Sequence, residues 1–167
     1  MTPDPRPLPP TEVARLLDSA VAMIRAELAA LPDEVLAWHP APGEWCAKEV
    51  VGHLIESEGR GFAGRIRIIL ASDTPTLETW DQNEVARARR DCERDATELV
   101  NELAGLRRES VALVAGLSAT DLGRGGRHPK VGLLRVGDLL HEWVHHDRNR
   151  PPVLRQLARS AEAAAYQ

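Results

Sequence analysis

The amino-acid sequence predicts an all-α protein: a four-helix bundle with long connecting loops and a C-terminal helical tail. Four long segments carry apolar residues at three- and four-residue steps, the pattern of an amphipathic helix. Loops rich in proline and glycine separate these segments, and we find no strand-like alternation of useful length. Four such segments in one chain are typical of a bundle.

The chain of 167 residues suits one domain, which we expect to span residues 11–167. Residues 1–10 form a proline-rich lead that we expect to be non-helical, and either disordered or laid on the surface. Thr11 is the expected N-cap of the first helix, and Pro32 is expected to end it. Residues 32–44 hold three prolines and a glycine, which predicts an ordered turn pinned to the bundle by Trp38 and Trp45.

The second helix is predicted at about 47–71, with Cys46 in the N-cap position and Glu49 three residues on. A short helix is expected at 83–90. Asp95, with Glu98 three residues later, predicts the start of the third long helix. Residues 118–134 read as a long connecting loop. The fourth helix is predicted from Val136, with a kink or break at residues 151–152 and a helical tail at 153–165.

Composition argues against several classes of function. The net charge of −4 gives no basic footprint for nucleic acid, and no apolar stretch is long enough to cross a membrane. Two cysteines, Cys46 and Cys92, form no CxxC pair, so we expect free thiols in a reducing cytoplasm. No signal peptide is recognisable. The expected location is therefore cytoplasmic.

Six histidines are candidates for function. His141 and His145, four residues apart, first suggest a metal pair. At about 100° per residue, however, both point away from the apolar face of the fourth helix, so we expect them in solvent. His39 and His128 each precede a proline and are expected to be loop side chains satisfied by backbone carbonyls.

His146 lies about 20° from Leu139 on the helical wheel, at the border of the apolar face, where it can point inward. Asp147 falls near the centre of that face, and a buried carboxylate needs a partner. The candidates are Arg150, another arginine, or a ligating histidine that Asp147 orients. A salt-bridged Asp147 without any metal is the alternative.

His53 shares its sector of the second helix with Ser57, Gly61 and Gly64, small residues that leave a close helix contact or a cavity. It is either a satisfied core histidine or half of a site at which His53 and His146 converge near one end of the bundle. We expect Glu56 and Glu58 to be solvated or paired with arginines such as Arg60 and Arg65.

Two sequence blocks stand out: EWCAKEVVGHL at 44–54, followed by Ser57 and Glu58, and VGDLLHEW at 136–143, followed by HDRN at 146–149. The loop from Gly126 to Gly132 accompanies the second block. Together they resemble the DinB-like superfamily of bacterial four-helix bundles, over roughly residues 11–156. In that family three histidines bind one divalent metal ion, zinc or nickel.

The resemblance implies that His53 and His146 are two of these ligands. The third falls at position 150, where this chain has Arg150, or at Val153 if residues 150–152 are an insertion. Two neutral imidazoles alone make a weak site, and a guanidinium opposes the ion. Either the metal is lost, or a third ligand comes from Glu142, His141 or a substrate thiolate.

The family includes thiol S-transferases that use bacillithiol, a mycothiol-dependent isomerase and metal-dependent hydrolases. The resemblance therefore implies an enzyme that acts on a small-molecule substrate, resembling a thiol S-transferase or a hydrolase. In such an enzyme a divalent ion activates a thiol or water, and Arg150 would bind an anionic co-substrate such as a low-molecular-weight thiol. It also implies a homodimer. The alternatives are a non-catalytic small-molecule-binding protein and a structural homodimer, both without the metal.

Overall fold

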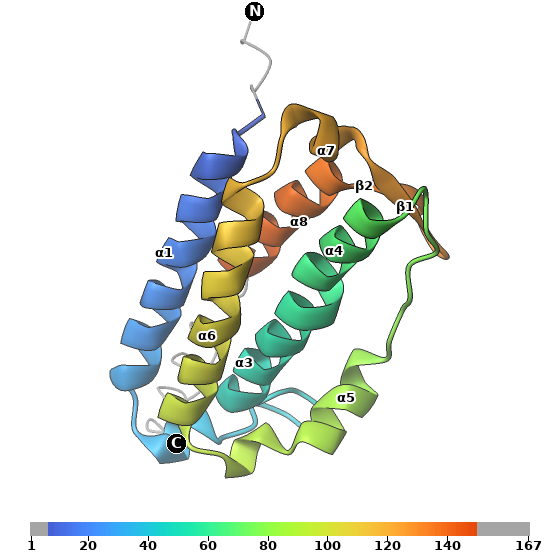
Figure 1. The fold of residues 1–167 in the computed structure, drawn as a ribbon. Helices are drawn as coiled ribbons and strands as arrows, with labels where there is room; N and C mark the ends of the chain where they lie inside the picture. The colour runs from blue at the N-terminus through green and yellow to red at the C-terminus, as the bar shows by residue number, and fades with distance from the viewer. Residues whose placement is uncertain (1–6, 150–167) are drawn as a thin grey trace, which may run out of the picture.

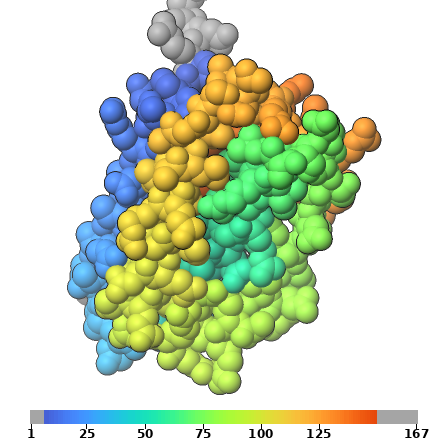
Figure 2. Space-filling model, viewed as in Figure 1, coloured from blue at the N-terminus to red at the C-terminus, as the bar shows by residue number. Residues whose placement is uncertain are grey.

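The structure, a computed structural model, describes residues 7–149, and its long helices lie side by side as a bundle (Figure 1). The helices of the bundle are α1 (Pro10–Ala29), α3 (Ala47–Glu56) continued by η1 (Ser57–Phe62) and α4 (Ala63–Ala71), α6 (Ala96–Ala115), and α8 (Val136–Asn149). Helix α1 packs against α6 and α8, while α3 packs against α6 and α4 against α8. On the face shown in Figure 2, α6 runs between α1 and the α3–α4 rod. The predicted fold class is confirmed.

The first helix begins earlier than the sequence suggested. Its first residue is Pro10 and its N-cap is Pro9, so the expectation of a cap at Thr11 and of no helix before it was wrong. Proline is tolerated at the first helical position because the N–H that it lacks has no partner inside the helix. The helix ends at Ala29, close to Pro32 as expected.

The loop that precedes α3 contains one short helix, α2 (Asp33–Leu36), where only a turn was predicted. Buried Lys48 of α3 forms an ion pair with Asp33, with 2.5 Å between Nζ and Oδ1. This contact ties the loop to the bundle. Trp45 lies against the bundle, with its ring centroid 5.0 Å from that of His53, whereas Trp38 is 37% exposed.

The second long helix is not uniform. Between α3 and α4 the backbone forms the π-helical segment η1, which includes Ser57 and Glu58. Such wide turns are rare in proteins and are found frequently at functional sites. Here the wide turn follows His53 by one turn of helix, so it lies beside the candidate site.

Helix α5 (Gln82–Arg89) and the single turn η2 (Asp91–Glu93) connect the second and third long helices. Asp81 caps α5 by accepting hydrogen bonds from the backbone N–H groups of Glu84 and Asn83, which lower its pKa. Asp95 caps α6 in the same way, as predicted.

Residues 118–134 are more ordered than the predicted loop. They contain α7 (Ala119–Gly123) and the first strand of an antiparallel hairpin, β1 (Gly125–His128) with β2 (Gly132–Arg135). Gly132, at φ +77°, supplies the left-handed residue that a short hairpin loop requires. The strands have four residues each and β1 contains two glycines, so alternation could not reveal them.

Cys46 and Cys92 form a disulfide bond, so the expectation of free thiols was wrong. The loop before α3 and the turn η2 meet at the same end of the bundle, and the two Cα atoms lie 6.7 Å apart, within disulfide reach. Among residues 7–149, no helix combines the length and the apolar character needed to span a bilayer.

The apolar core falls into two clusters with a polar layer between them. On α1, one cluster ends at Leu17 and the other begins at Val21; on α6, one ends at Leu103 and the other begins at Val114. The buried polar side chains in this layer come from α3, η1, α6 and α8: His53, Ser57, Glu58, Arg107, Ser110 and Asp147.

Arg107 is the centre of the polar layer. Its guanidinium donates two hydrogen bonds to Glu58, at 2.7 and 2.8 Å, and lies 2.8 Å from the Asp147 carboxylate. It also donates to the carbonyl of Leu17. Burial alone lowers the pKa of Arg107, but the attraction of Asp147 and Glu58 outweighs this effect, and the pKa is raised.

We predict that Arg107→Ala destabilises the protein by about 3–5 kcal/mol, because it leaves the Glu58 and Asp147 carboxylates buried without their cation. Urea unfolding followed by circular dichroism measures this change. Arg108→Ala, at the exposed neighbouring position, is the matched control and should stay within about 0.5 kcal/mol of wild type. Equal effects of the two substitutions would contradict the role given to Arg107.

Candidate functional site

The structure brings His53 and His146 together. Their Nε2 atoms lie 3.1 Å apart and their ring centroids 5.2 Å apart, although 93 residues separate them in the chain. His53 comes from α3 and is 8% exposed, whereas the side chain of His146, from α8, is 19% exposed. The two imidazoles therefore meet at one point between α3 and α8, and this point is close to solvent.

Polar and aromatic neighbours fix the two rings. Ser57, one turn after His53, places its Oγ 3.3 Å from His53 Nε2. The Trp45 ring packs on His53, and the Phe62 ring meets His146 with its edge, 5.4 Å between centroids. These contacts leave the two Nε2 atoms directed toward each other.

Behind His146 lies the polar layer. Asp147 Oδ1 is 3.6 Å from His146 Nδ1, which is buried and makes no hydrogen bond to the described residues. Asp147 is held in turn by Arg107, and Glu58 accepts a hydrogen bond from Trp143 Nε1 at 3.2 Å. One guanidinium against two carboxylates leaves formal negative charge next to His146, which favours a cation at the site.

The other histidines lie elsewhere. His141 and His145 are exposed, as predicted, and line a groove on the outer side of α8 with Leu8 and Leu140. His128 accepts a hydrogen bond from the backbone N–H of Lys130 rather than donating to a carbonyl. Burial, together with the charges of Arg65 and Lys130, lowers its pKa.

His39 also differs from expectation. Its Nε2 lies 3.0 Å from the Glu49 carboxylate and 3.6 Å from Cys92 Sγ, so its partners are side chains and not the expected backbone carbonyls. This contact is at the beginning of α3.

Two of the buried charges were missed or misassigned from the sequence. Glu58 was expected to be solvated, or paired with a surface arginine, but it is 1% exposed and bound to Arg107. The helical wheel contained the signal, since Glu58 lies about 20° from Val51 and Arg107 about 20° from Val100, both buried. Glu56 is paired with Arg60, as expected, and with Arg89.

Arg150, predicted to bind a co-substrate, lies outside the described residues, as do the kink at 151–152 and the tail at 153–165. Asp147 was expected to pair with Arg150, another arginine or a ligating histidine; its partner is another arginine, Arg107 of α6, and His146 Nδ1 lies 3.6 Å from the Asp147 carboxylate. His141 and Glu142, the other possible third ligands, are exposed.

The spacing of the two imidazoles fits a shared metal ion. Zinc–nitrogen bonds of about 2.0–2.1 Å in a tetrahedral arrangement hold two nitrogens about 3.3 Å apart, close to the observed 3.1 Å. A hydrogen bond in which one neutral imidazole donates to the other fits the same spacing. The buried Nδ1 of His146 beside Asp147 matches the usual arrangement of a ligating histidine and its carboxylate partner.

Comparison with known proteins places this bundle in a family. The sequence model of the DinB superfamily matches residues 3–150, which is most of the chain. The chain belongs to the DinB superfamily. This result confirms the resemblance seen in the two sequence blocks.

Two proteins similar to this chain are informative. A protein of Oceanobacillus iheyensis, named "Putative metal-dependent hydrolase OB0782", is 22% identical over 107 residues, which cover 64% of this chain and 61% of that protein. The chain therefore aligns with about three fifths of the length of that relative. The structure of YfiT from Bacillus subtilis, described as "a probable metal-dependent hydrolase with an unusual four-helix bundle topology", superimposes with a TM-score of 0.81. The match covers 97% of this chain and 93% of YfiT at 18% identity, which supports the fold alone.

Proposed function

We propose that this DinB-superfamily protein is a metal-dependent hydrolase whose divalent ion is held by His53 and His146. The observation that carries the proposal is the 3.1 Å approach of the two Nε2 atoms, with a carboxylate behind one of them. The two relatives are described as a "putative" and a "probable" metal-dependent hydrolase, and these descriptions support the same reaction class.

Each neighbouring residue has a role in this proposal. Trp45 packs on the His53 ring, and Asp147 orients His146 and supplies negative charge that favours a bound cation. Ser57 Oγ lies 3.3 Å from His53 Nε2, next to the proposed ion position. His53 and His146 would hold a divalent ion that, when bound, would supply Lewis-acid chemistry: a lower pKa for a water or thiol and a polarised substrate carbonyl. Arg107 keeps Asp147 in place and does not contact the reacting atoms in this scheme.

We assign the remaining ligand positions to the substrate. Among the described residues, the side chains of His141 and Glu142 are exposed, and we give them no ligand role in this scheme. Arg150 is proposed to bind an anionic group of a co-substrate. If that co-substrate is a low-molecular-weight thiol, its thiolate completes the donor set and the reaction becomes thiol transfer.

The proposed site predicts a bound metal ion. Protein purified without a histidine tag and without reductant should contain about one equivalent of zinc or nickel, measured by inductively coupled plasma mass spectrometry. His146→Ala and His53→Ala should remove it, because each deletes half of the paired imidazoles. His145→Ala, an exposed histidine adjacent in sequence, is the matched control and should keep the metal. Equal metal content in all four proteins would contradict the site.

The proposed site also predicts a hydrolytic activity that depends on the metal ion. Hydrolysis of a panel of chromogenic esters and amides should fall to background after dialysis against a chelator and return on addition of zinc or nickel. The same panel with a low-molecular-weight thiol and an electrophile distinguishes thiol transfer. A small molecule that stabilises the protein against heat equally with and without chelator, with no turnover, would instead support a non-catalytic binding protein.

A further inference from the structure

We propose that His39, Cys46, Glu49 and Cys92 form a second metal site, one that the redox state of the two cysteines controls. When Cys46 and Cys92 are reduced, the four side chains bind one zinc ion. When the two thiolates are oxidised to the disulfide, the ion is released. This site is separate from the His53–His146 pair and does not depend on the proposed function.

The first support is the set of donor atoms. One ligand atom from each residue, an imidazole nitrogen, two sulfurs and a carboxylate oxygen, lies within 4.8 Å of every other. His39 Nε2 is directed at both the Glu49 carboxylate, at 3.0 Å, and Cys92 Sγ, at 3.6 Å. Donors of a tetrahedral zinc ion lie roughly 3.3–3.8 Å apart. To bind an ion, the two sulfurs must therefore separate, and donors that lie up to 4.8 Å apart must move closer.

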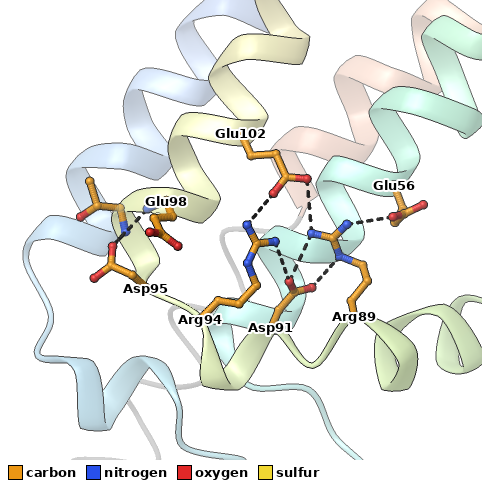
Figure 3. Close-up of polar contacts among 8 residues, drawn as sticks. Glu56, Arg89, Asp91, Arg94, Asp95, Glu98 and Glu102 are labelled. Atoms are coloured by element: carbon orange, nitrogen blue, oxygen red, sulfur yellow. Dashed lines mark hydrogen bonds and ion pairs between the residues drawn. The ribbon is translucent and has the colours of Figure 1, made fainter.

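The second support is that an ion-pair network positions Cys92 without the disulfide. Its neighbour Asp91 is 1% exposed and binds Arg89 at 2.7 Å and Arg94 at 3.3 Å (Figure 3). These arginines reach Glu56 of the second long helix and Glu102 of α6, at 2.9 and 2.8 Å. The turn η2 is therefore anchored to two helices on both sides of Cys92.

Gly52 allows the turn η2 to approach α3 closely. A Cβ atom at Gly52 would lie 1.7 Å from Asp91 Oδ2, so only glycine lets the Asp91 carboxylate rest on α3. Cys46 begins the same helix, and its backbone N–H donates to Glu49 Oε2 at 2.9 Å. The backbone segments that carry the ligands, at the start of α3 and in η2, are thus held next to each other after the sulfur–sulfur bond is cut, while the cysteine side chains can rotate apart.

The third support is that part of the cluster is accessible from solvent. Cys46 is fully buried at the N-terminal end of α3, whereas Cys92 is partly exposed and the His39 side chain is 47% exposed. A reductant and a metal ion can therefore reach the cluster from the side of Cys92 and His39.

Reduction and re-formation of the Cys46–Cys92 disulfide each transfer two electrons. A thiolate of an external dithiol attacks Cys92 Sγ and Cys46 leaves as a thiolate; the second thiol of the dithiol, as its thiolate, then displaces Cys92 and closes to a disulfide. Two electrons pass to the protein, and zinc binds to the two protein thiolates. In the reverse direction, hydrogen peroxide accepts two electrons: one thiolate forms a sulfenic acid, the other displaces hydroxide from it, and two protons complete two water molecules.

The test uses cobalt(II) as the probe, because only thiolate ligation gives a sulfur-to-metal charge-transfer absorption in the near ultraviolet. Full-length protein is reduced, desalted without oxygen and titrated with cobalt. We expect a charge-transfer band that saturates at about one equivalent and disappears when zinc is added in excess. Hydrogen peroxide should abolish the band and release the metal. Protein that was never reduced should show no band.

Variants locate the ligands. Cys92→Ser should abolish the charge-transfer band or reduce it to a weak single-thiolate band, and His39→Ala should weaken binding by about tenfold or more. His145→Ala is the matched control and should bind as the wild type does. The band should persist in the His53→Ala/His146→Ala variant, which separates this proposal from the function proposed above.

Two outcomes overturn the proposal. One is reduced protein, with both thiols titrated and normal circular dichroism, that shows no charge-transfer band with cobalt. The other is protein that loses its helical circular dichroism on reduction and does not recover it with zinc.

Discussion

The bundle depends on one buried guanidinium. Arg107 of α6 contacts the backbone of α1 at Leu17, the carboxylate of Glu58 on η1 and the carboxylate of Asp147 on α8, and so joins all four rods of the bundle. A buried charge without a partner costs several kcal/mol, so these four rods cannot shift independently. The two apolar clusters lie on either side of this junction.

The same junction leads to the candidate site. Asp147 follows His146 directly, so the contact that holds Asp147 to Arg107 also fixes the position of the His146 backbone. Glu58 follows His53 by little more than one helical turn and is bound to the same arginine. The two imidazoles therefore approach because a shared cation holds both of their helices. Stability and the geometry of the site have a common origin in this protein.

The sequence predicted much of the fold and part of the site. Helix periodicity located the long helices. The helical wheel placed His146 inward and His145 outward, because successive residues of a helix are rotated by a fixed angle of about 100°. The pairing with His53 needed the family resemblance as well. The Cys46–Cys92 contact could not be predicted, because it depends on how two irregular connections pack. Metal binding, the role of the chain beyond residue 149 and dimerisation stay predictions.

We propose that His53 and His146 converge on a cation because the junction around Arg107 holds them. Crystals grown with zinc, with diffraction measured at the zinc absorption edge, test it directly. We expect an anomalous peak about 2.0–2.1 Å from Nε2 of both histidines, with Arg107 between the carboxylates of Glu58 and Asp147. Imidazoles that point away from each other, with no peak between them, would contradict it.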